Sequence, residues 1–381
     1  MPIITCGTMR CQVTWFPDNV PVLSFGSKKV LSSPSQRSLV EVIRKCLKMG
    51  INHFETARMY GTSEMQVVDA LCGMIESGEI KRSDFIIQTK VVPSETGKAF
   101  AKTWEASWKH MQRLEYVDLF AFHAVSNEWQ ADWVLSDDDD MPMAFMKDLK
   151  AKGIIRHIGF STHGPANNIM RLISSNKFDF VNIHAHYFGD YHAEGTPIND
   201  GLEHGNSACV RKALELDMGV FLISPYDKGG KLYKPTKTVA SAVGHKLTPI
   251  SFASLYCWKK AGIHTFSVGL ARMSDLDETL EAARLYSMEG IDDEVDAADK
   301  RLKAVYEEKL GSEWMEKGML NLPSYYCEET NGTALGHTLW CHNIVKAYGM
   351  YEFAKDRYGN LEDTRASWSE KKSFEDNAKA M

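Results

Sequence analysis

The sequence lacks the closely spaced cysteines that zinc and iron–sulfur sites use. Its eight cysteines are scattered, and no two of them form a Cys-x-x-Cys pair. The sequence therefore predicts neither a zinc site nor a cluster-binding motif. We interpret the cysteines as reduced thiols that are mostly buried, which is typical of a reducing compartment.

Long apolar runs and strong charge imbalance are also missing. No apolar run reaches the roughly 18 residues that a membrane-spanning helix needs. We expect no signal peptide, since a strand-like segment begins at Ile3. The net charge of −6 gives no indication of nucleic-acid binding. We therefore expect a cytoplasmic protein that binds neither membranes nor nucleic acids.

The remaining composition is that of a globular protein, with 44% apolar and 25% charged residues. A chain of 381 residues fits one large barrel with an appendage, or two domains. Strand-like segments recur along it, near residues 3–8, 51–56, 85–91, 117–123, 155–161, 179–185, 219–224 and 265–270.

Stretches with helical periodicity separate these strands, as at 38–49, 99–114 and 143–152. Alternating strands and helices predict a (β/α)₈ TIM barrel. Two doubly wound domains are the competing architecture. No Gly-x-Gly-x-x-Gly fingerprint follows an early strand, which disfavours that alternative.

The stretch Gly50–Glu64 (GINHFETARMYGTSE) is the most informative part of the chain. A short buried strand ends at Glu55, and Tyr60 follows in the loop beside Gly61. Thr62 or Ser63 can cap the next helix. Glu55 and Tyr60 are thus predicted at the carboxyl end of a strand, where barrel enzymes carry their chemistry.

This stretch resembles the signature of the aldo-keto reductase family, in which an acid-Thr-Ala and a Tyr-Gly-x-Ser-Glu follow one another. Further matching strings come in order: Thr89-Lys90-Val91, Val117-Asp118-Leu119 with His123, Ile158-Gly159-Phe160-Ser161, and Leu222-Ile223-Ser224-Pro225. The resemblance covers roughly residues 3–285. It departs from the family at Glu55, where Asp is usual. A subset of the family with a C-terminal extension, often carrying iron–sulfur clusters, looks more similar.

The resemblance implies an NAD(P)H-dependent oxidoreductase that reduces a small carbonyl compound or oxidises its alcohol. By the same resemblance, Tyr60 is the acid/base, Lys90 tunes it, Glu55 holds Lys90, and His123 orients the carbonyl. A lysine ammonium lowers a nearby tyrosine's pKa, ordinarily near 10, because it favours the phenolate.

For the cofactor, the resemblance places Ser161 and Thr162 at the nicotinamide carboxamide, with Thr162 where Asn is usual. His184 stands where the family has Gln, and Ile223 stands where an aromatic residue would stack. Both Thr162 and His184 can hydrogen-bond an amide. Lys228 and Gly229 belong to a glycine-containing loop after Ser224 that can wrap the diphosphate.

The last strand of the predicted barrel ends at Gly269, shortly before a helix that begins near Ser274. A helix start favours phosphate. Arg272 is placed to meet the 2′-phosphate of NADP, whereas Asp275 would repel it. The resemblance favours NADP over NAD.

We assign residues 1–288 to the barrel and 289–381 to a helical C-terminal extension that packs on it. Helices are predicted at Asp292–Lys309 and Thr338–Tyr351, and the last twenty residues are polar and expected to be poorly ordered. Only Cys327 and Cys341 remain in the extension, so we expect no cluster there.

Substrate specificity is expected to come from the tail and from two long loops, Asn127–Met141 and Asp190–Ser207. Trp15, Trp129 and Tyr191 are candidate pocket residues or ordinary packing residues. The Asp137–Asp140 run in the first loop is interpreted as solvated, with a cation site as the alternative.

Two other functions stay open from the sequence. The departures at Glu55, Thr162, His184 and Ile223 also fit a non-catalytic barrel that senses a nucleotide or binds a partner. Alternatively, His184-x-His186 and His123 could hold the metal of a barrel hydrolase, because residues two apart on a strand share a face.

Overall fold

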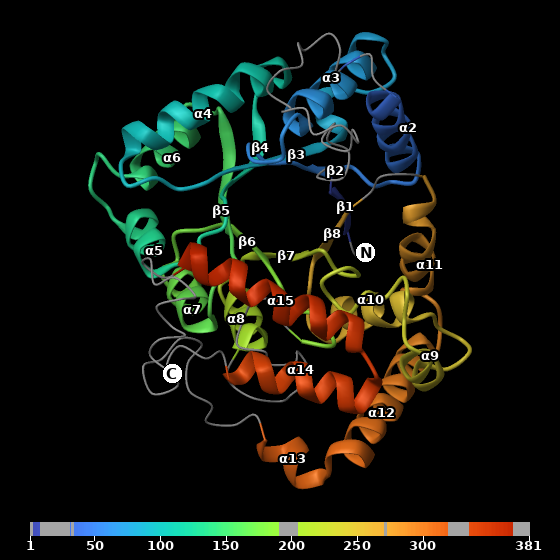
Figure 1. Ribbon diagram of the computed structural model, residues 1–381. Helices are drawn as coiled ribbons and strands as arrows, with labels where there is room; N and C mark the ends of the chain where they lie inside the picture. Colours follow the sequence, from blue (N-terminus) through green and yellow to red (C-terminus); the bar gives the residue numbers. More distant parts are fainter. Residues whose placement is uncertain are drawn as a thin grey trace.

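The protein folds around a closed barrel of parallel strands (Figure 1). The computed structural model describes residues 3–7, 31, 34–189, 205–269, 273–318 and 335–368. Strands pair in sequence order and β8 closes on β1. The strands are β1 (Ile3–Gly7), β2 (His53–Glu55), β3 (Ile86–Val91), β4 (Val117–Phe122), β5 (Ile155–Ser161), β6 (Phe180–Ile183), β7 (Gly219–Ile223) and β8 (Thr265–Gly269).

Every predicted strand is present, within two residues of its expected ends. The closed order of strands confirms the (β/α)₈ barrel and contradicts two doubly wound domains. β6 is buried along its whole length. Apart from Asn182 its residues are apolar, as expected for a strand whose outer face is covered by helices while side chains fill the barrel interior.

Helices ring the barrel, as Figure 1 shows. They are α2 (Pro34–Lys48), α3 (Ser63–Glu76), α4 (Gly97–Met111), α5 (Glu128–Leu135), α6 (Pro142–Ala151), α7 (Ala166–Ser174), α8 (Gly205–Glu215), α9 (Lys237–Val243), α10 (Pro249–Lys259) and α11 (Asp277–Leu285), with 3₁₀ turns at Arg82–Asp84, Gln112–Leu114 and Met273–Leu276. α2 buries Leu39, Val42, Ile43 and Cys46. This inward face has the predicted spacing of three and four residues.

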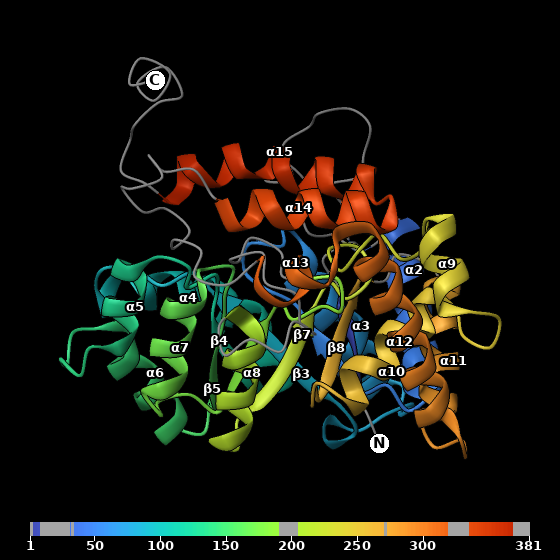
Figure 2. The same ribbon diagram turned by 90° about the horizontal axis from the view of Figure 1, so that it is seen from below.

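The extension is helical and packs on the barrel, as predicted. Its helices are α12 (Ile291–Leu310), α13 (Ser312–Lys317), α14 (Leu335–Tyr348) and α15 (Tyr351–Trp368). In Figure 2, α14 and α15 lie across one end of the barrel. The Trp340 indole of α14 donates to the Phe188 carbonyl, which follows β6, at 2.6 Å. The Thr236 hydroxyl, which follows β7, donates to the Tyr348 carbonyl at 2.7 Å. These helices therefore cover the carboxyl ends of β6 and β7.

Two expectations about the C-terminal extension, the order of its last residues and its boundary at residue 288, stay predictions. We expected poor order in the last twenty residues; α15 ends among them at Trp368, and the expectation stays a prediction. Residues 369–381 lie outside the described part. The division of the chain into domains at residue 288 stays a prediction, because α12 shares one core with the barrel helices through Val295, Ala298 and Leu302.

A polar layer crosses the barrel interior below the carboxyl end. His53 Nε2 is hydrogen-bonded to Gln88 Oε1 at 3.0 Å, and Gln88 Nε2 donates to Asn182 Oδ1 at 2.7 Å. These side chains come from β2, β3 and β6 and are buried. Burial lowers the pKa of His53 to about 4, because the interior disfavours the imidazolium. His53 is therefore neutral in the folded protein at neutral pH.

Acid should destabilise the protein through this buried histidine. Unfolding raises the pKa of His53 from about 4 to the ordinary 6.5, so the unfolded state binds more protons between these values. The stability is present above pH 6.5 and is lost as the pH falls toward 4. From pH 7 to pH 5 the contribution of His53 should fall by about 2 kcal/mol. Urea unfolding at both pH values measures this change.

The variant His53→Asn isolates that contribution. Its free energy of unfolding should fall by about 2 kcal/mol less than the wild type's over the same pH range. The exposed His245 offers a matched control, and His245→Asn should behave like the wild type. Equal losses in His53→Asn and the wild type would show that His53 already titrates normally in the folded protein.

Candidate active site

A buried ion pair lies where β2 and β3 reach the carboxyl end of the barrel. Glu55 ends β2 and Lys90 lies near the end of β3; they are 3% and 1% exposed. The Lys90 ammonium pairs with the Glu55 carboxylate and also donates to the Thr56 carbonyl at 3.0 Å. The other Glu55 oxygen accepts a hydrogen bond from the Ser267 hydroxyl of β8. The glutamate therefore links three strands.

The pair keeps both of its charges despite burial. Burial opposes ionisation of both groups, but the Lys90 ammonium holds the pKa of Glu55 below its ordinary value. Likewise, burial works against the ammonium, yet the Glu55 carboxylate beside it raises the pKa of Lys90. Lys90 therefore carries its positive charge at neutral pH.

Tyr60 and His123 lie beside this pair. The Lys90 ammonium is 4.9 Å from the centroid of the half-buried Tyr60 ring. The Tyr60 and His123 rings meet edge to face, with centroids 5.5 Å apart. His123 directly follows β4. The structure thus brings together the four residues that the sequence predicted, from three neighbouring strands.

The loop after β2 holds Tyr60 in a tight turn. The Tyr60 amide donates to the Ala57 carbonyl, and the Ser63 amide donates to the Tyr60 carbonyl, each at 2.9 Å. Gly61 has a φ of +55°, a conformation that glycine adopts without strain. Thr62 occupies the N-cap position of α3, but its hydroxyl donates to the Gln66 side chain, so the predicted capping hydrogen bond is not formed.

The pKa of Tyr60 differs from our expectation. Burial raises it above the ordinary value and the Glu55 carboxylate adds to the rise, while Lys90 opposes both. The phenol is therefore protonated at neutral pH, the state that a proton donor needs. The pKa of His123 falls to about 3 through burial and the charges of Lys90 and Lys228, which leaves a neutral imidazole.

Two backbone positions beside the site are strained. Ala124 and Ser224 follow the ends of β4 and β7 with φ angles of +56° and +48°, in the left-handed region that non-glycine residues avoid. The Ala124 amide donates to the Ser161 hydroxyl at 2.9 Å. Ser161, expected at the nicotinamide, thus also supports the turn behind His123.

The other residues expected at the carboxamide are hydrogen-bonded within the protein. The Thr162 hydroxyl donates to the Val125 carbonyl at 2.8 Å. His184 lies between two further histidines, with its Nε2 2.8 Å from His163 Nδ1 and its Nδ1 3.0 Å from His186 Nε2. The roles of Thr162 and His184 toward a cofactor stay predictions.

The chain of three histidines bears on the metal-hydrolase alternative. His184 and His186 are hydrogen-bonded to each other through their ring nitrogens, and that pairing occupies two of the nitrogens a metal would need. Within the described residues, no group of three or more His, Cys, Asp or Glu side chains is placed to hold a metal ion.

The loop after β7 contains Lys228, whose positive charge contributes to the low pKa of His123. The Lys228 amide donates to the Ser224 carbonyl at 3.2 Å, which closes the turn. Burial and the nearby Arg357 lower the pKa of Lys228 to about 8, while Asp227 opposes the change. At Gly229 a Cβ would lie 2.1 Å from the Pro225 carbonyl oxygen, so only glycine fits.

Two expected phosphate residues lie near β8. Gly269 is the last residue of β8, opposite Gly7 of β1. Arg272 lies outside the described residues. Its predicted contact with a 2′-phosphate, and the choice between NADP and NAD, therefore stay predictions.

The long loop predicted at 127–141 contains a short helix, and its expected part in specificity stays a prediction. α5 fills Glu128–Leu135, and Trp129 is 40% exposed on it. Trp15 and Tyr191 lie outside the described residues, as do residues 190–204 of the second loop. The aspartate run at 137–140 is exposed, as expected.

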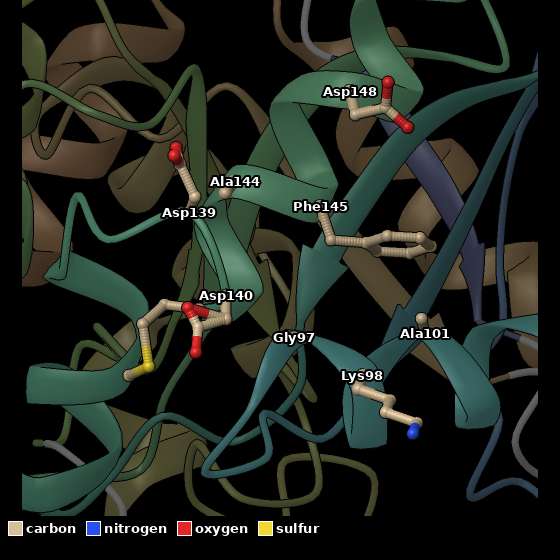
Figure 3. A pocket seen from close by; sticks show the side chains of 9 residues that line it. Gly97, Lys98, Ala101, Asp139, Asp140, Ala144, Phe145 and Asp148 are labelled. Carbon is tan, nitrogen blue, oxygen red and sulfur yellow. The ribbon is translucent and has the colours of Figure 1, made fainter.

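A pocket of about 430 Å³ adjoins this run (Figure 3). It lies in the outer helical layer between α4 and α6, and its lining residues are Gly97, Lys98, Ala101, Asp139, Asp140, Met141, Ala144, Phe145 and Asp148. None of the candidate catalytic residues lines it. The pocket is therefore separate from the Tyr60 site.

Among the helices that the structure describes, none combines the length and the apolar character needed to cross a membrane.

Comparison with known proteins identifies a family. The aldo/keto reductase family model matches residues 22–293. Among curated proteins, aldo-keto reductase family 1 member C2 of Homo sapiens is 27% identical over 154 residues, which are 37% of this chain and 47% of that protein. NADP-dependent D-sorbitol-6-phosphate dehydrogenase of Malus domestica is 31% identical over 106 residues, which are 27% of this chain and 31% of that protein. The chain thus spans about half or less of these relatives' length.

Solved structures show the same fold at low identity. The aldose reductase of Schistosoma japonicum is 18% identical with a TM-score of 0.53, covering 79% of this chain and 88% of that one. An aldo-keto reductase of Bacillus halodurans in its holo form is 17% identical with a TM-score of 0.55, covering 78% and 91%. One from Klebsiella pneumoniae in complex with NADPH is 17% identical with a TM-score of 0.51, covering 68% and 84%.

Proposed function

The chain belongs to the aldo/keto reductase family, and we propose that it is an NAD(P)H-dependent oxidoreductase that interconverts a small carbonyl compound and its alcohol. One observation carries the proposal. Tyr60, Lys90, Glu55 and His123 meet at the carboxyl end of the barrel, where a protonated phenol lies beside a fixed ammonium. This arrangement can deliver a proton to a carbonyl oxygen.

Each residue has a distinct part in the proposed reduction. A bound nicotinamide dinucleotide supplies the hydride. The neutral His123 orients the carbonyl oxygen by hydrogen bonding, and the Tyr60 hydroxyl donates its proton to that oxygen. The phenolate left behind is stabilised by the Lys90 ammonium, 4.9 Å from the ring centroid. Glu55, held by Ser267, keeps Lys90 in position.

The cofactor proposal rests on the loop after β7 and on the end of β8. Ser224, Lys228 and Gly229 would hold the diphosphate, and Gly269 and Arg272 would lie at the adenosine end. The donor set fits an anion, because Lys228 supplies a positive charge and the nearby His186 Nδ1 is buried with no hydrogen-bond partner in the described structure. The relatives named with NADP or NADPH support NADP as the preferred cofactor.

Titration of the purified protein with NADPH and with NADH tests the proposal. The nine tryptophans allow binding to be followed by energy transfer to the nicotinamide. We expect micromolar binding of NADPH and weaker binding of NADH. Absence of binding to both nucleotides at millimolar concentration would contradict the proposal. It would instead favour a non-catalytic partner-binding barrel, a reading consistent with the internal hydrogen bonds of His184.

A further inference from the structure

The C-terminal helix α15 lies against the loop that is proposed to hold the diphosphate. Lys231 of that loop forms an ion pair with Asp356 of α15. A Cβ at Gly230 would lie 3.1 Å from Met350 Cε, just before the helix begins. Figure 2 shows α15 passing over the barrel end. The extension is therefore in direct contact with the candidate cofactor site.

Arg357 is the next residue of α15 after Asp356, and its positively charged side chain is buried. It is only 7% exposed, and its guanidinium lies 5.3 Å from the Phe353 ring. Burial lowers the pKa values of Lys228 and His186, and the charge of Arg357 lowers both further. The charge of Lys228 in turn contributes to the low pKa of His123, after burial and Lys90. Positively charged side chains are thus present both on α15 and beside the candidate catalytic residues.

Arg357 is buried and Lys228 is half-buried, so both cations lose hydration, and their like charges repel each other. An anion placed between them offsets both costs. A guanidinium presents a planar fork of donors that matches phosphate oxygens, and an ammonium adds a point charge. Beside them, the buried His186 Nδ1 has no hydrogen-bond partner in the described structure and can also face a ligand.

We propose that Arg357 of α15 and Lys228 of the β7 loop together bind the diphosphate of the nicotinamide dinucleotide. The proposal rests on the proposed function, because it takes the dinucleotide as the ligand. It makes the C-terminal extension part of the cofactor site rather than a cover on the barrel.

The variant Arg357→Ala tests the proposal by equilibrium binding of NADPH and NADH. Both dissociation constants should rise about tenfold or more, by similar factors, because the two nucleotides share the diphosphate. Lys355→Ala is the matched control. It removes a positive charge two residues away on an exposed position of the same helix. Its dissociation constants should stay within about twofold of the wild type's, as expected for a screened surface charge.

Other outcomes would overturn the assignment. Unchanged binding of both nucleotides would show that Arg357 does not contact the cofactor. Weaker binding of NADPH alone would place the 2′-phosphate at Arg357 instead. Should Arg357→Ala fail to fold, Arg357→Lys keeps the charge but loses the bidentate fork, and it should weaken both nucleotides severalfold.

Inorganic pyrophosphate separates this proposal from the proposed function. It should raise the melting temperature of the wild type and of Lys355→Ala, but not that of Arg357→Ala. If the wild type binds neither nucleotide, the proposed function fails. Stabilisation by pyrophosphate that depends on Arg357 would then still support the two-cation site, and its absence would overturn that site as well.

Discussion

Replacing Tyr60 by phenylalanine should lower the rate of carbonyl reduction by about 10²- to 10⁴-fold, the usual contribution of a positioned general acid. The variant removes the proton that the substrate oxygen receives. It keeps the ring that packs against His123 and lies over Lys90. The dissociation constant for NADPH should therefore stay close to the wild-type value while kcat falls. Steady-state kinetics and the fluorescence titration measure the two quantities separately.

A tyrosine elsewhere supplies the control for this variant. Tyr351 is 59% exposed at the start of α15, so Tyr351→Phe makes the same chemical change on the surface. Its kcat should equal that of the wild type. Full activity in Tyr60→Phe would show that another group supplies the proton, and the assignment of Tyr60 as the acid would have to be abandoned.

The sequence predicted most of the barrel because parallel strands carry a strong local signal. β7 is a short apolar run and β3 is rich in β-branched residues, and the helices between strands repeat apolar residues every three or four positions. The alternation of strands and helices also predicted that Tyr60, Lys90 and His123 lie at one end of the barrel. Carboxyl ends of parallel strands meet at one edge, so residues far apart in sequence are brought together by topology alone.

Local sequence patterns could not predict the contact of Ser267 with Glu55 or the burial of Arg357. Ser267 lies 212 residues from its partner Glu55, and a serine in a buried strand has no sequence pattern that marks it. Arg357 belongs to α15, whose charged sequence gave little indication of a helix at all. Its burial depends on α15 crossing the barrel end. The positions of both side chains follow from tertiary packing rather than from local periodicity.

The pKa of Tyr60 shows another limit of sequence reasoning. The sequence identified Lys90 as a nearby cation, and a cation alone lowers a phenol's pKa. It could not show that the half-buried phenol is desolvated enough to raise its pKa, nor that Glu55 would oppose the effect of Lys90 on the phenol. Burial outweighs the attraction in the folded chain, which reverses the direction that we expected.

Replacing Lys90 by methionine should destabilise the protein by about 3–5 kcal/mol, the usual cost of leaving one member of a buried ion pair without its partner. Methionine fills a similar volume, so the loss reflects the stranded Glu55 carboxylate, which is 3% exposed, more than lost packing. Urea unfolding at pH 7 measures the change. Carbonyl reduction should also be lost, because nothing then stabilises the Tyr60 phenolate.

The double variant Lys90→Met/Glu55→Gln separates these two effects. Glutamine is neutral and can still accept a hydrogen bond from the Ser267 hydroxyl, so the double variant should recover at least about half of the stability lost by Lys90→Met. Its activity should stay as low as that of Lys90→Met, since the ammonium is still missing. Recovery of activity together with stability would mean that Lys90 serves only to neutralise Glu55. Stability without activity would show that the ammonium acts on Tyr60, because the carboxylate's need for a partner has then been removed.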